Sequence, residues 1–434
     1  MGEPETCSKS PLVSMNILML SSTFPYPPSR GGTEIRTFNL LKYLHQHHAV
    51  TLVTQSYGGI SEREITELRQ WTKELMIFPL PPDPKIQGGI GGGLRKIQRF
   101  IQSIIQVTPP NVQHRYSLEI QELVDNFVAT GKYDVITCEH SVNEIYIRPE
   151  YRTKVKTIVN VHSSVYAWTR NHLEAGASTN IWRDRLYLGL LYAYEKRYCQ
   201  KFTNIVATTE DDRKQFLQFH PPAEIAVIPN GVDLDLFPYR DRDPNGRELI
   251  FVGAMDASHN IDAASFFALE VLPILQKSYP EMVFKIVGAR PTPAVLALNN
   301  HPGVIVTGAV DSMVEQLHAA TIAVIPLRTG FGIKNKTLEA MAAGIPVVGS
   351  DRGLEGLEVD GENTPLRALR ANSVAEYVQA ISKLLVDAEL RSQLSKNARI
   401  HIETTYTWSN AGRQYEQILG CFDIPSGFTQ SLHI

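Results

Sequence analysis

Residues 16–54 read NILMLSSTFPYPPSRGGTEIRTFNLLKYLHQHHAVTLVT. The opening NILMLS is a short apolar run followed by a proline-rich loop, a pattern typical of a fully buried parallel strand. From Thr33 to Leu44, apolar side chains recur three residues apart and predict an amphipathic helix. The AVTLVT run at residues 49–54 predicts a second strand. Strand, helix and strand in this order form a βαβ unit, which predicts an α/β fold with a parallel sheet.

The same rhythm continues along the chain in two successive series. The first series has further predicted strands at residues 133–137, 157–161, 204–207 and 225–228. A polar stretch at residues 239–248, YRDRDPNGRE, then predicts a linker because it combines charge, proline and glycine. The second series has predicted strands at residues 248–252, 283–287, 304–307, 322–326 and 346–349. We therefore expect two Rossmann-like domains, residues 15–238 and 248–405, that face each other across a cleft at the carboxyl edges of their sheets.

Composition excludes several classes of protein. The 434 residues carry a formal net charge of −3, which argues against a nucleic-acid partner. No apolar run is long enough for a membrane-spanning helix. Residues 1–14 are polar, lack the apolar core of a signal peptide and are interpreted as a disordered extension. The four cysteines have no metal-ligand spacing and are interpreted as reduced thiols of a cytoplasmic protein.

Two glycine turns are candidate phosphate-binding sites. Gly31 and Gly32 lie between the first predicted strand and helix, where bare backbone N–H groups and a helix N-terminus favour an anion. The alternative for so common a pair is an ordinary turn. The stronger candidate is GFGIKNKTLEAMAAG at residues 330–344, where Lys334 and Lys336 precede Glu339 on a predicted helix. Cations suit a phosphate and the carboxylate suits ribose hydroxyls, whereas the alternative is a solvated, surface-exposed set of charges.

A histidine marks the end of one predicted strand. His162, in the sequence NVHS, follows the predicted strand at residues 157–161, and the carboxyl edge of a parallel sheet faces the expected cleft. A structural histidine is the alternative interpretation.

At residues 330–344 the chain resembles glycosyltransferase family 4, whose members are retaining enzymes with the GT-B fold. The similarity extends over about residues 15–420. Its motifs occur in the family's order and read NILMLSSTFPYPPSRGG, VHSS, IPNGVD, FVGAMD, GIKNKTLEAMAAGIPVVGS and TYTWSNAGRQYEQI. The chain is most similar to sugar transferases of bacterial exopolysaccharide clusters. The resemblance implies transfer of a sugar from a nucleotide-sugar donor to a glycan or lipid-linked glycan acceptor on the first domain.

The resemblance also implies roles for matched positions. Gly31 and Gly32 would lie against the donor diphosphate, and Gly253 would begin a second phosphate loop. His162 would reach the donor sugar near the reacting centre, and Glu339 would bind the ribose. The other expected donor-binding residues are Gly332, Ile333, Lys334, Asn335 and Lys336. Residues 406–434 would form a helix that crosses back to the first domain.

The chain departs from the family's pattern in two places. Phe331 stands where the family has the first of two signature glutamates, which normally touches hydroxyls of the donor sugar. The loop that begins at Gly253 also lacks the family's usual arginine and lysine. A cation must still neutralise the leaving diphosphate, and we expect this catalytic cation to be Lys334, followed by Lys336 and Arg328 as alternatives.

The sequence also bears on metal ions, cofactors and alternative functions. No Asp-x-Asp motif occurs in the cleft-facing loops, so we predict no metal and no cofactor beyond the nucleotide-sugar. The loss of the glutamate at Phe331 favours one alternative, a non-catalytic sugar-nucleotide-binding protein. Another GT-B activity is a further alternative, whereas the missing GxGxxG argues against an NAD enzyme.

A basic amphipathic segment lies at residues 94–107, LRKIQRFIQSIIQV. We expect its isoleucine and phenylalanine face to pack on the first domain. The alternative is a helix that touches the inner membrane face. The expected hinges are residues 239–248 and the crossing near Trp408.

Overall fold

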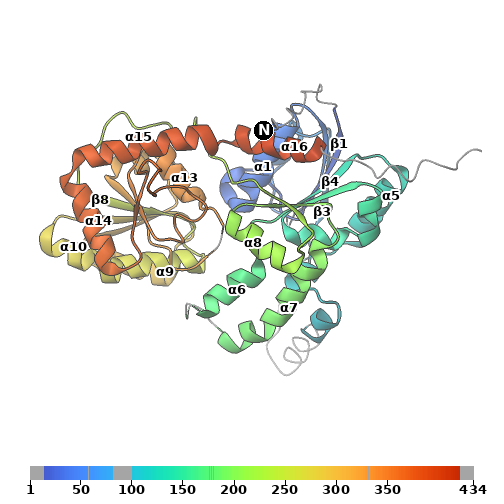
Figure 1. Cartoon of the computed structure of the whole chain (residues 1–434), viewed down its shortest axis with the longest axis horizontal. Coiled ribbons are helices and arrows are strands. Elements are labelled where there is room, and N and C mark those ends of the chain that lie inside the picture. The colour runs from blue at the N-terminus through green and yellow to red at the C-terminus, as the bar shows by residue number, and fades with distance from the viewer. Residues whose placement is uncertain are drawn as a thin grey trace, which may run out of the picture.

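The structure is a computed structural model that describes residues 14–56, 58–81, 100–174, 176, 178, 180–330 and 332–420. The predicted extension therefore lies outside the described residues except for Ser14, and so do Phe331 and residues 421–434. Figure 1 shows two α/β domains side by side, joined by connections that run between them.

The N-terminal domain contains a seven-stranded parallel sheet in the order β3-β2-β1-β4-β5-β6-β7. Its strands are β1 (Asn16–Ser21), β2 (Ala49–Ser56), β3 (Glu74–Pro79), β4 (Val135–Glu139), β5 (Lys156–Asn160), β6 (Asn204–Ala207) and β7 (Glu224–Val227). Its helices are α1 (Gly32–Leu44), α2 (Glu62–Arg69), α4 (Pro110–Gln113), α5 (Leu118–Thr130), α6 (Val165–Glu174), α7 (Ile181–Cys199) and α8 (Glu210–Phe219). Short 3-10 helices occur at Pro28–Arg30, Ser141–Tyr146 and Pro149–Thr153. The sequence pattern missed β3 because this edge strand is only partly buried.

The C-terminal domain repeats this design with a six-stranded parallel sheet in the order β10-β9-β8-β11-β12-β13. Its strands are β8 (Glu248–Val252), β9 (Val283–Val287), β10 (Val304–Gly308), β11 (Ile322–Ile325), β12 (Val347–Gly349) and β13 (Leu369–Arg370). Its helices are α9 (Ser258–Phe266), a π-helical turn (Phe267–Val271), α10 (Leu272–Ser278), α11 (Pro293–Ala297), a 3-10 turn (Leu298–Asn300), α12 (Met313–Ala319), α13 (Asn335–Ala342), α14 (Val374–Val386) and α15 (Ala388–Thr405). A final helix is α16 (Trp408–Gly420).

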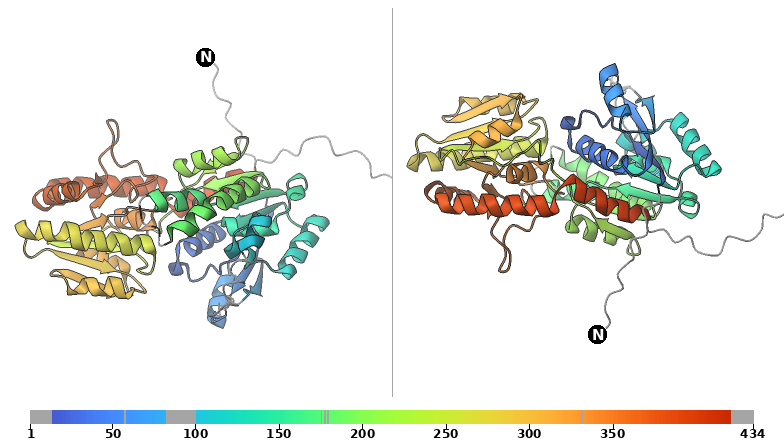
Figure 2. Two further views of the ribbon diagram at one scale, coloured as in Figure 1. Left: turned by 90° about the horizontal axis from the view of Figure 1, so that it is seen from below. Right: turned by 90° about the horizontal axis from the view of Figure 1, so that it is seen from above.

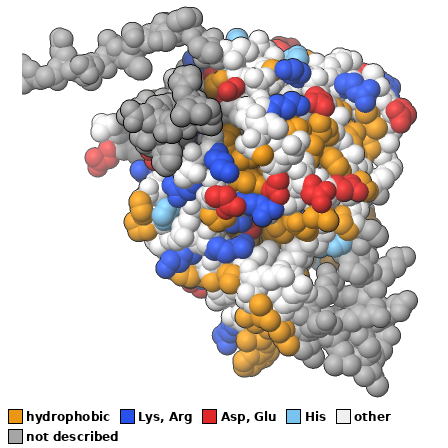
Figure 3. All heavy atoms as spheres, turned by 90° about the vertical axis from the view of Figure 1, so that its right-hand side faces the viewer, with side chains coloured by type: hydrophobic (Ala, Val, Ile, Leu, Met, Phe, Trp, Pro, Cys, Tyr) orange, Lys and Arg blue, Asp and Glu red, His pale blue; other side chains and the backbone are white. Residues whose placement is uncertain are grey.

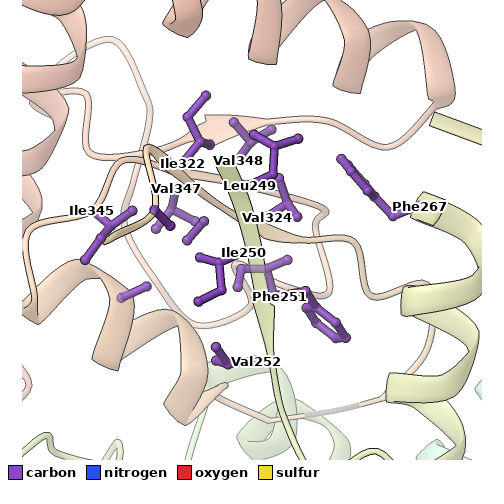
Figure 4. Packing of buried hydrophobic residues seen from close by; sticks show 14 of the residues in the cluster. Leu249, Ile250, Phe251, Val252, Phe267, Ile322, Val324, Ile345, Val347 and Val348 are labelled. Carbon is purple, nitrogen blue, oxygen red and sulfur yellow. The ribbon is translucent and has the colours of Figure 1, made fainter. Parts of the chain in front are cut away.

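The apolar runs become central strands because both faces of each sheet are covered by helices. In the C-terminal domain, Ile250, Phe251, Val324 and Val348 are completely buried between these layers (Figure 4). Burial on both faces requires strands that are apolar throughout rather than alternating, which is the pattern of the NILMLS run. The predicted pair of Rossmann-like sheets is confirmed.

The two connections between the domains cross at Gly231, earlier in the chain than the predicted hinge at residues 239–248. Val232 N–H donates to the Tyr406 carbonyl at 2.8 Å. A Cβ atom on Gly231 would lie 2.3 Å from Trp408 N, so only glycine allows the two backbones to approach this closely. The crossing predicted near Trp408 is therefore present, and Gly231 is its partner.

Residues 239–248 belong to the C-terminal domain rather than to a free linker. Arg240 is buried, and its N–H donates to the Ala343 carbonyl at 3.1 Å. Buried Arg391 of α15 donates from Nε to Asp243 at 2.6 Å. The polar residues that predicted a linker are thus hydrogen-bonded to the C-terminal domain. The sequence could not reveal these bonds, because the partner residues are distant along the chain.

Helix α16 lies against α1 of the N-terminal domain, as the right-hand view of Figure 2 shows. Tyr415 and Leu419 of α16 are buried in the same apolar cluster as Ile17 of β1. The described helices include none that is long and apolar enough to cross a bilayer.

The expectation that residues 94–107 pack their apolar face on the first domain is wrong for the part that can be seen. Residues 94–99 lie outside the described residues, and the chain is helical from 100 to 105. Ile101, Ile104 and Ile105 are 51%, 49% and 76% exposed. Only Phe100 makes an aromatic contact, with Tyr187 of α7, at a ring distance of 5.1 Å.

Candidate functional site

The carboxyl edges of the two sheets meet where His162 faces the glycine turn of the C-terminal domain. His162 follows β5, and Gly332 follows β11. A Cβ atom on Gly332 would lie 2.7 Å from the His162 carbonyl oxygen and 3.2 Å from Thr208 Oγ1. The φ of Gly332 is +79°, in the left-handed region that favours glycine. The structure therefore brings the predicted histidine and the predicted glycine turn together.

A second histidine, which the sequence reasoning missed, lies beside the first. The rings of His140 and His162 are 5.1 Å apart between centroids. His140 directly follows β4 and has a φ of 90°, a strained conformation of the kind that clusters at functional sites. Burial lowers the pKa of His140 to about 4 and also lowers the pKa of His162, so both rings are neutral at neutral pH. The sequence could have indicated His140, because His140 and His162 each lie just after one of two adjacent strands, β4 and β5.

Two of the three candidate cations, Lys334 and Arg328, are already paired with carboxylates. Lys334 Nζ donates to Glu355 Oε2 at 3.2 Å and to the Gly332 carbonyl. Both charged side chains are at most 10% exposed. Arg328, the third candidate, is paired through Nε and Nη2 with Asp262. Lys334 and Arg328 already face carboxylates, which the sequence could not show because Glu355 and Asp262 are distant along the chain.

Lys336 lies beside the bare backbone of Gly253 in the C-terminal domain. Its Nζ donates to Asn260 Oδ1 and lies 4.4 Å from the ring centroid of Phe251. A Cβ atom on Gly253 would lie 2.7 Å from this amine, so the bare backbone of Gly253 borders it directly. Among the described residues, no carboxylate lies within salt-bridge distance of Lys336. Burial and the nearby Lys334 charge lower the pKa of Lys336 to about 7.

Glu339 lies one helical turn after Lys336 on α13. Burial raises the pKa of its carboxyl to about 7, and the charge of Lys336 opposes this rise. Lys336 has an amide partner but no carboxylate at salt-bridge distance among the described residues, and burial disfavours the charge of both groups, so this pair is a candidate for ligand binding rather than for stability.

Two other predicted donor residues have structural partners. Ile333 is 8% exposed and packs in the core of the C-terminal domain, so its side chain is not available to a donor. Asn335 Oδ1 accepts a hydrogen bond from Asn230 Nδ2 at 2.8 Å. Asn230 follows β7 of the other domain, and this contact therefore links the domains.

The first glycine turn has a less favourable setting for an anion than the sequence predicted. Gly31 is fully extended, and a Cβ atom there would lie 2.7 Å from Glu34 Oε2. The pKa of Arg290, in the other domain, is raised by its hydrogen bonds to Asp256 and by the charge of Glu34. The start of α1 at Gly32 thus faces the C-terminal domain but carries a carboxylate.

A cavity of about 440 Å³ opens beside the start of α1 in the N-terminal domain. Its lining includes Thr33, Glu34, Gln55 and Arg115. Gln55 is 2% exposed, and its Oε1 has no hydrogen-bond partner among the described residues. These hydroxyl, amide and charged groups suit a polar, hydroxylated ligand. The described residues include no group of three or more metal-binding side chains.

Sequence models of two families match the chain in succession. Glycosyltransferase Family 4 matches residues 30–236, and Glycosyl transferases group 1 matches residues 246–387. The structure of the Anabaena protein HepE in complex with UDP is similar, with a TM-score of 0.63 and 15% identity. This similarity covers 94% of the present chain and 100% of that chain.

The chain therefore has the two-domain GT-B fold, and each domain matches a glycosyltransferase family model. Two curated relatives are similar to part of the chain. Glycogen synthase of Mycobacterium tuberculosis is 28% identical over 206 residues, 45% of this chain and 48% of that protein. D-inositol 3-phosphate glycosyltransferase of Gordonia bronchialis is 23% identical over 244 residues, 50% of this chain and 52% of that protein. The chain spans about half the length of these relatives.

The two matched regions divide the candidate site between them. The Family 4 region contains His140, His162 and most of the lining of the cavity beside α1. The group 1 region contains Gly253, Lys336 and the rest of the glycine turn.

Proposed function

We propose that this glycosyltransferase moves a sugar from a nucleotide-sugar donor to a hydroxyl group of a glycan or lipid-linked glycan, with retention of configuration. We place the reaction in exopolysaccharide biosynthesis and expect it to need no metal ion or other cofactor. The observation that carries the proposal is the Lys336 amine, which borders the bare backbone of Gly253 and faces no carboxylate at salt-bridge distance among the described residues. UDP is the first donor nucleotide to test, because the HepE structure holds UDP.

The arrangement supports the following sequence of events. The anomeric carbon–oxygen bond of the donor breaks through an oxocarbenium-like transition state, and its electron pair moves to the leaving diphosphate. Lys336 and the N–H groups at the start of α13 stabilise the charge that develops there. The acceptor hydroxyl forms the new bond and passes its proton to the leaving phosphate. Neutral His162 positions the donor sugar, while Lys334 and Glu355 hold the glycine turn in place.

We assign the acceptor to the cavity beside α1. The unpartnered Oε1 of Gln55 accepts, and Arg115 donates, which is the combination that sugar hydroxyls require. The cavity lies next to Thr33 and Glu34 at the start of α1.

We also propose that the protein works in the cytoplasm and touches the inner face of the membrane, where a lipid-linked acceptor is presented. The support is an exposed apolar surface near α7, which we call the apolar tip. It consists of Ile101, Ile104, Ile105, Ile181, Trp182 and Leu186, each between 47% and 77% exposed. Figure 3 shows hydrophobic side chains gathered at the lower end of the molecule, the end that carries α6 and α7 in Figure 1.

Two variants test the proposal, one through turnover and one through donor binding. We expect Lys336→Ala to lower kcat by about 10²–10³, because it removes one preorganised group at the leaving diphosphate. Glu339→Ala should weaken UDP binding roughly tenfold or more, because it removes a charged hydrogen-bond acceptor for the ribose. The measurements are titration calorimetry with UDP-, GDP- and ADP-sugars and a transfer and donor-hydrolysis assay.

The matched control is Lys285→Ala, which removes a lysine that is paired with Glu248 at 2.9 Å on the C-terminal sheet. Unchanged UDP affinity in Glu339→Ala would remove this residue from the donor site. Full turnover in Lys336→Ala together with a loss in Lys334→Ala would return the cation role to Lys334. If nucleotide-sugars bind but are neither transferred nor hydrolysed, the alternative of a non-catalytic binding protein, which Phe331 favours, is correct.

A further inference from the structure

Buried polar side chains form a continuous path from the N-terminal sheet to the start of α13. Asn160 Nδ2 donates to Oε1 and Oε2 of Glu139 at 3.1 and 2.9 Å. Arg36 Nη2 donates to Asn160 Oδ1 at 3.4 Å, and Arg36 Nη1 donates to Asn230 Oδ1 at 2.8 Å. Asn230 Nδ2 then donates to Asn335 Oδ1 at 2.8 Å. The path therefore joins β4, β5, α1, the domain crossing and α13.

Four of the five members of this path are buried, and Asn335 is partly buried. Arg36 and Asn160 are 0% exposed, Glu139 is 1% exposed and Asn230 is 7% exposed. Burial lowers the pKa of Arg36, and the nearby Glu139 partly offsets this effect. Buried polar groups are costly unless each is hydrogen-bonded, so each member depends on its neighbours.

Both ends of the path lie next to residues of the candidate donor site. Asn160 precedes His162 by two residues, and Asn335 stands between Lys334 and Lys336. Asn230 immediately precedes Gly231, the point where the two connections between the domains touch. The Asn230 amide therefore contacts both domains beside this crossing.

We propose that Asn230 is a positioning residue that sets the register of α13 against the N-terminal domain, so that Lys336 and His162 act on the same donor molecule. Its Oδ1 is held by Arg36, and its Nδ2 holds Asn335. The expected effect of Asn230 on turnover rests on the proposed function. The expected effect of Asn230 on the position of α13 does not.

The kinetic test compares Asn230→Ala, Asn335→Ala and the double variant of the full chain. Each single substitution should lower kcat/KM about tenfold, which is the effect of one interdomain hydrogen bond and its unsatisfied partner. The double variant should be no worse than the more severe single variant, because both changes break the same bond. The Kd of UDP should change less than about twofold in Asn230→Ala, because Asn230 positions the helix and does not contact the nucleotide.

The control is Asn397→Ala, which removes one amide hydrogen bond, to the Leu366 carbonyl at 3.0 Å, within the C-terminal domain. It should leave kcat/KM within about twofold of the wild type. Additive effects of the two single variants, or a silent Asn230→Ala variant, would overturn the proposal. Weaker UDP binding in Asn335→Ala alone would show instead that Asn335 contacts the donor directly.

Amide hydrogen exchange tests the same contact without turnover. Residues 332–338 should exchange faster in both single variants than in the wild type and in Asn397→Ala. If the wild type transfers no sugar from any donor, the proposed function fails, but faster exchange still supports the positioning contact. Unchanged exchange in Asn230→Ala overturns it in either case.

Discussion

At the scale of single residues, Lys336 and Glu339 make the reaction sensitive to pH. Both groups have a pKa of about 7 in the free protein, lowered for the lysine and raised for the glutamate. Lys336 loses its charge as the pH rises through 7, and Glu339 loses its charge as the pH falls through 7. Under the proposed function, diphosphate binding needs the ammonium of Lys336 and ribose binding needs the carboxylate of Glu339. We therefore expect a narrow, bell-shaped profile of kcat/KM with its maximum near pH 7.

Lys336→Arg provides the control for this profile, because a guanidinium stays charged throughout the range. The variant should lose the alkaline limb and keep the acid limb. An alkaline limb that is identical in Lys336→Arg and the wild type would show that another group titrates there.

At the scale of elements, the return of α16 to the N-terminal domain depends on one glycine. A Cβ atom on Gly412 would lie 2.2–2.6 Å from ring atoms of Tyr43 on α1. We expect Gly412→Ala to reduce the free energy of unfolding by about 1–3 kcal/mol, because it separates two packed helices. Gly189→Ala is the matched control, since nothing lies within 4 Å of its Cβ position in α7. It should instead stabilise the protein by about 0.5–1 kcal/mol. Thermal and urea unfolding measure both, and equal effects would contradict the assigned helix contact.

At the scale of the whole molecule, the apolar tip should direct the protein to membranes. We expect the wild type to sediment with vesicles that contain anionic lipid. Trp182→Ser and Ile105→Ser should each weaken this binding about tenfold, because each removes a side chain that is 77% or 76% exposed and free to enter the interface. Ile400→Ser, at a 59% exposed position of α15, is the control and should bind as the wild type does. Concentration-dependent dimers that disappear in Trp182→Ser, without vesicle binding, would identify a second copy of the chain as the partner.

Much of the architecture could be predicted, because a short apolar run indicates a buried strand without knowledge of its partners. Asn16–Ser21 and Glu248–Val252 are examples. The edge strand Glu74–Pro79 escaped prediction because a half-buried strand has a weaker pattern. The linker predicted at residues 239–248 was wrong for a related reason, since charge, proline and glycine in this stretch look like a linker until their partners in the C-terminal domain are known.

The sequence by itself determined the two parallel-sheet domains, the glycine turn before α13 and the kind of ligand that such a turn suits. These features follow from local patterns, in which neighbours along the chain are also neighbours in space. Only the tertiary structure decided that Lys334 faces Glu355, that Lys336 borders Gly253, and that Asn230 spans the domains. Whether a charged side chain is free to bind a ligand depends on its partners in space. Those partners are distant along the chain and become neighbours only in the folded protein.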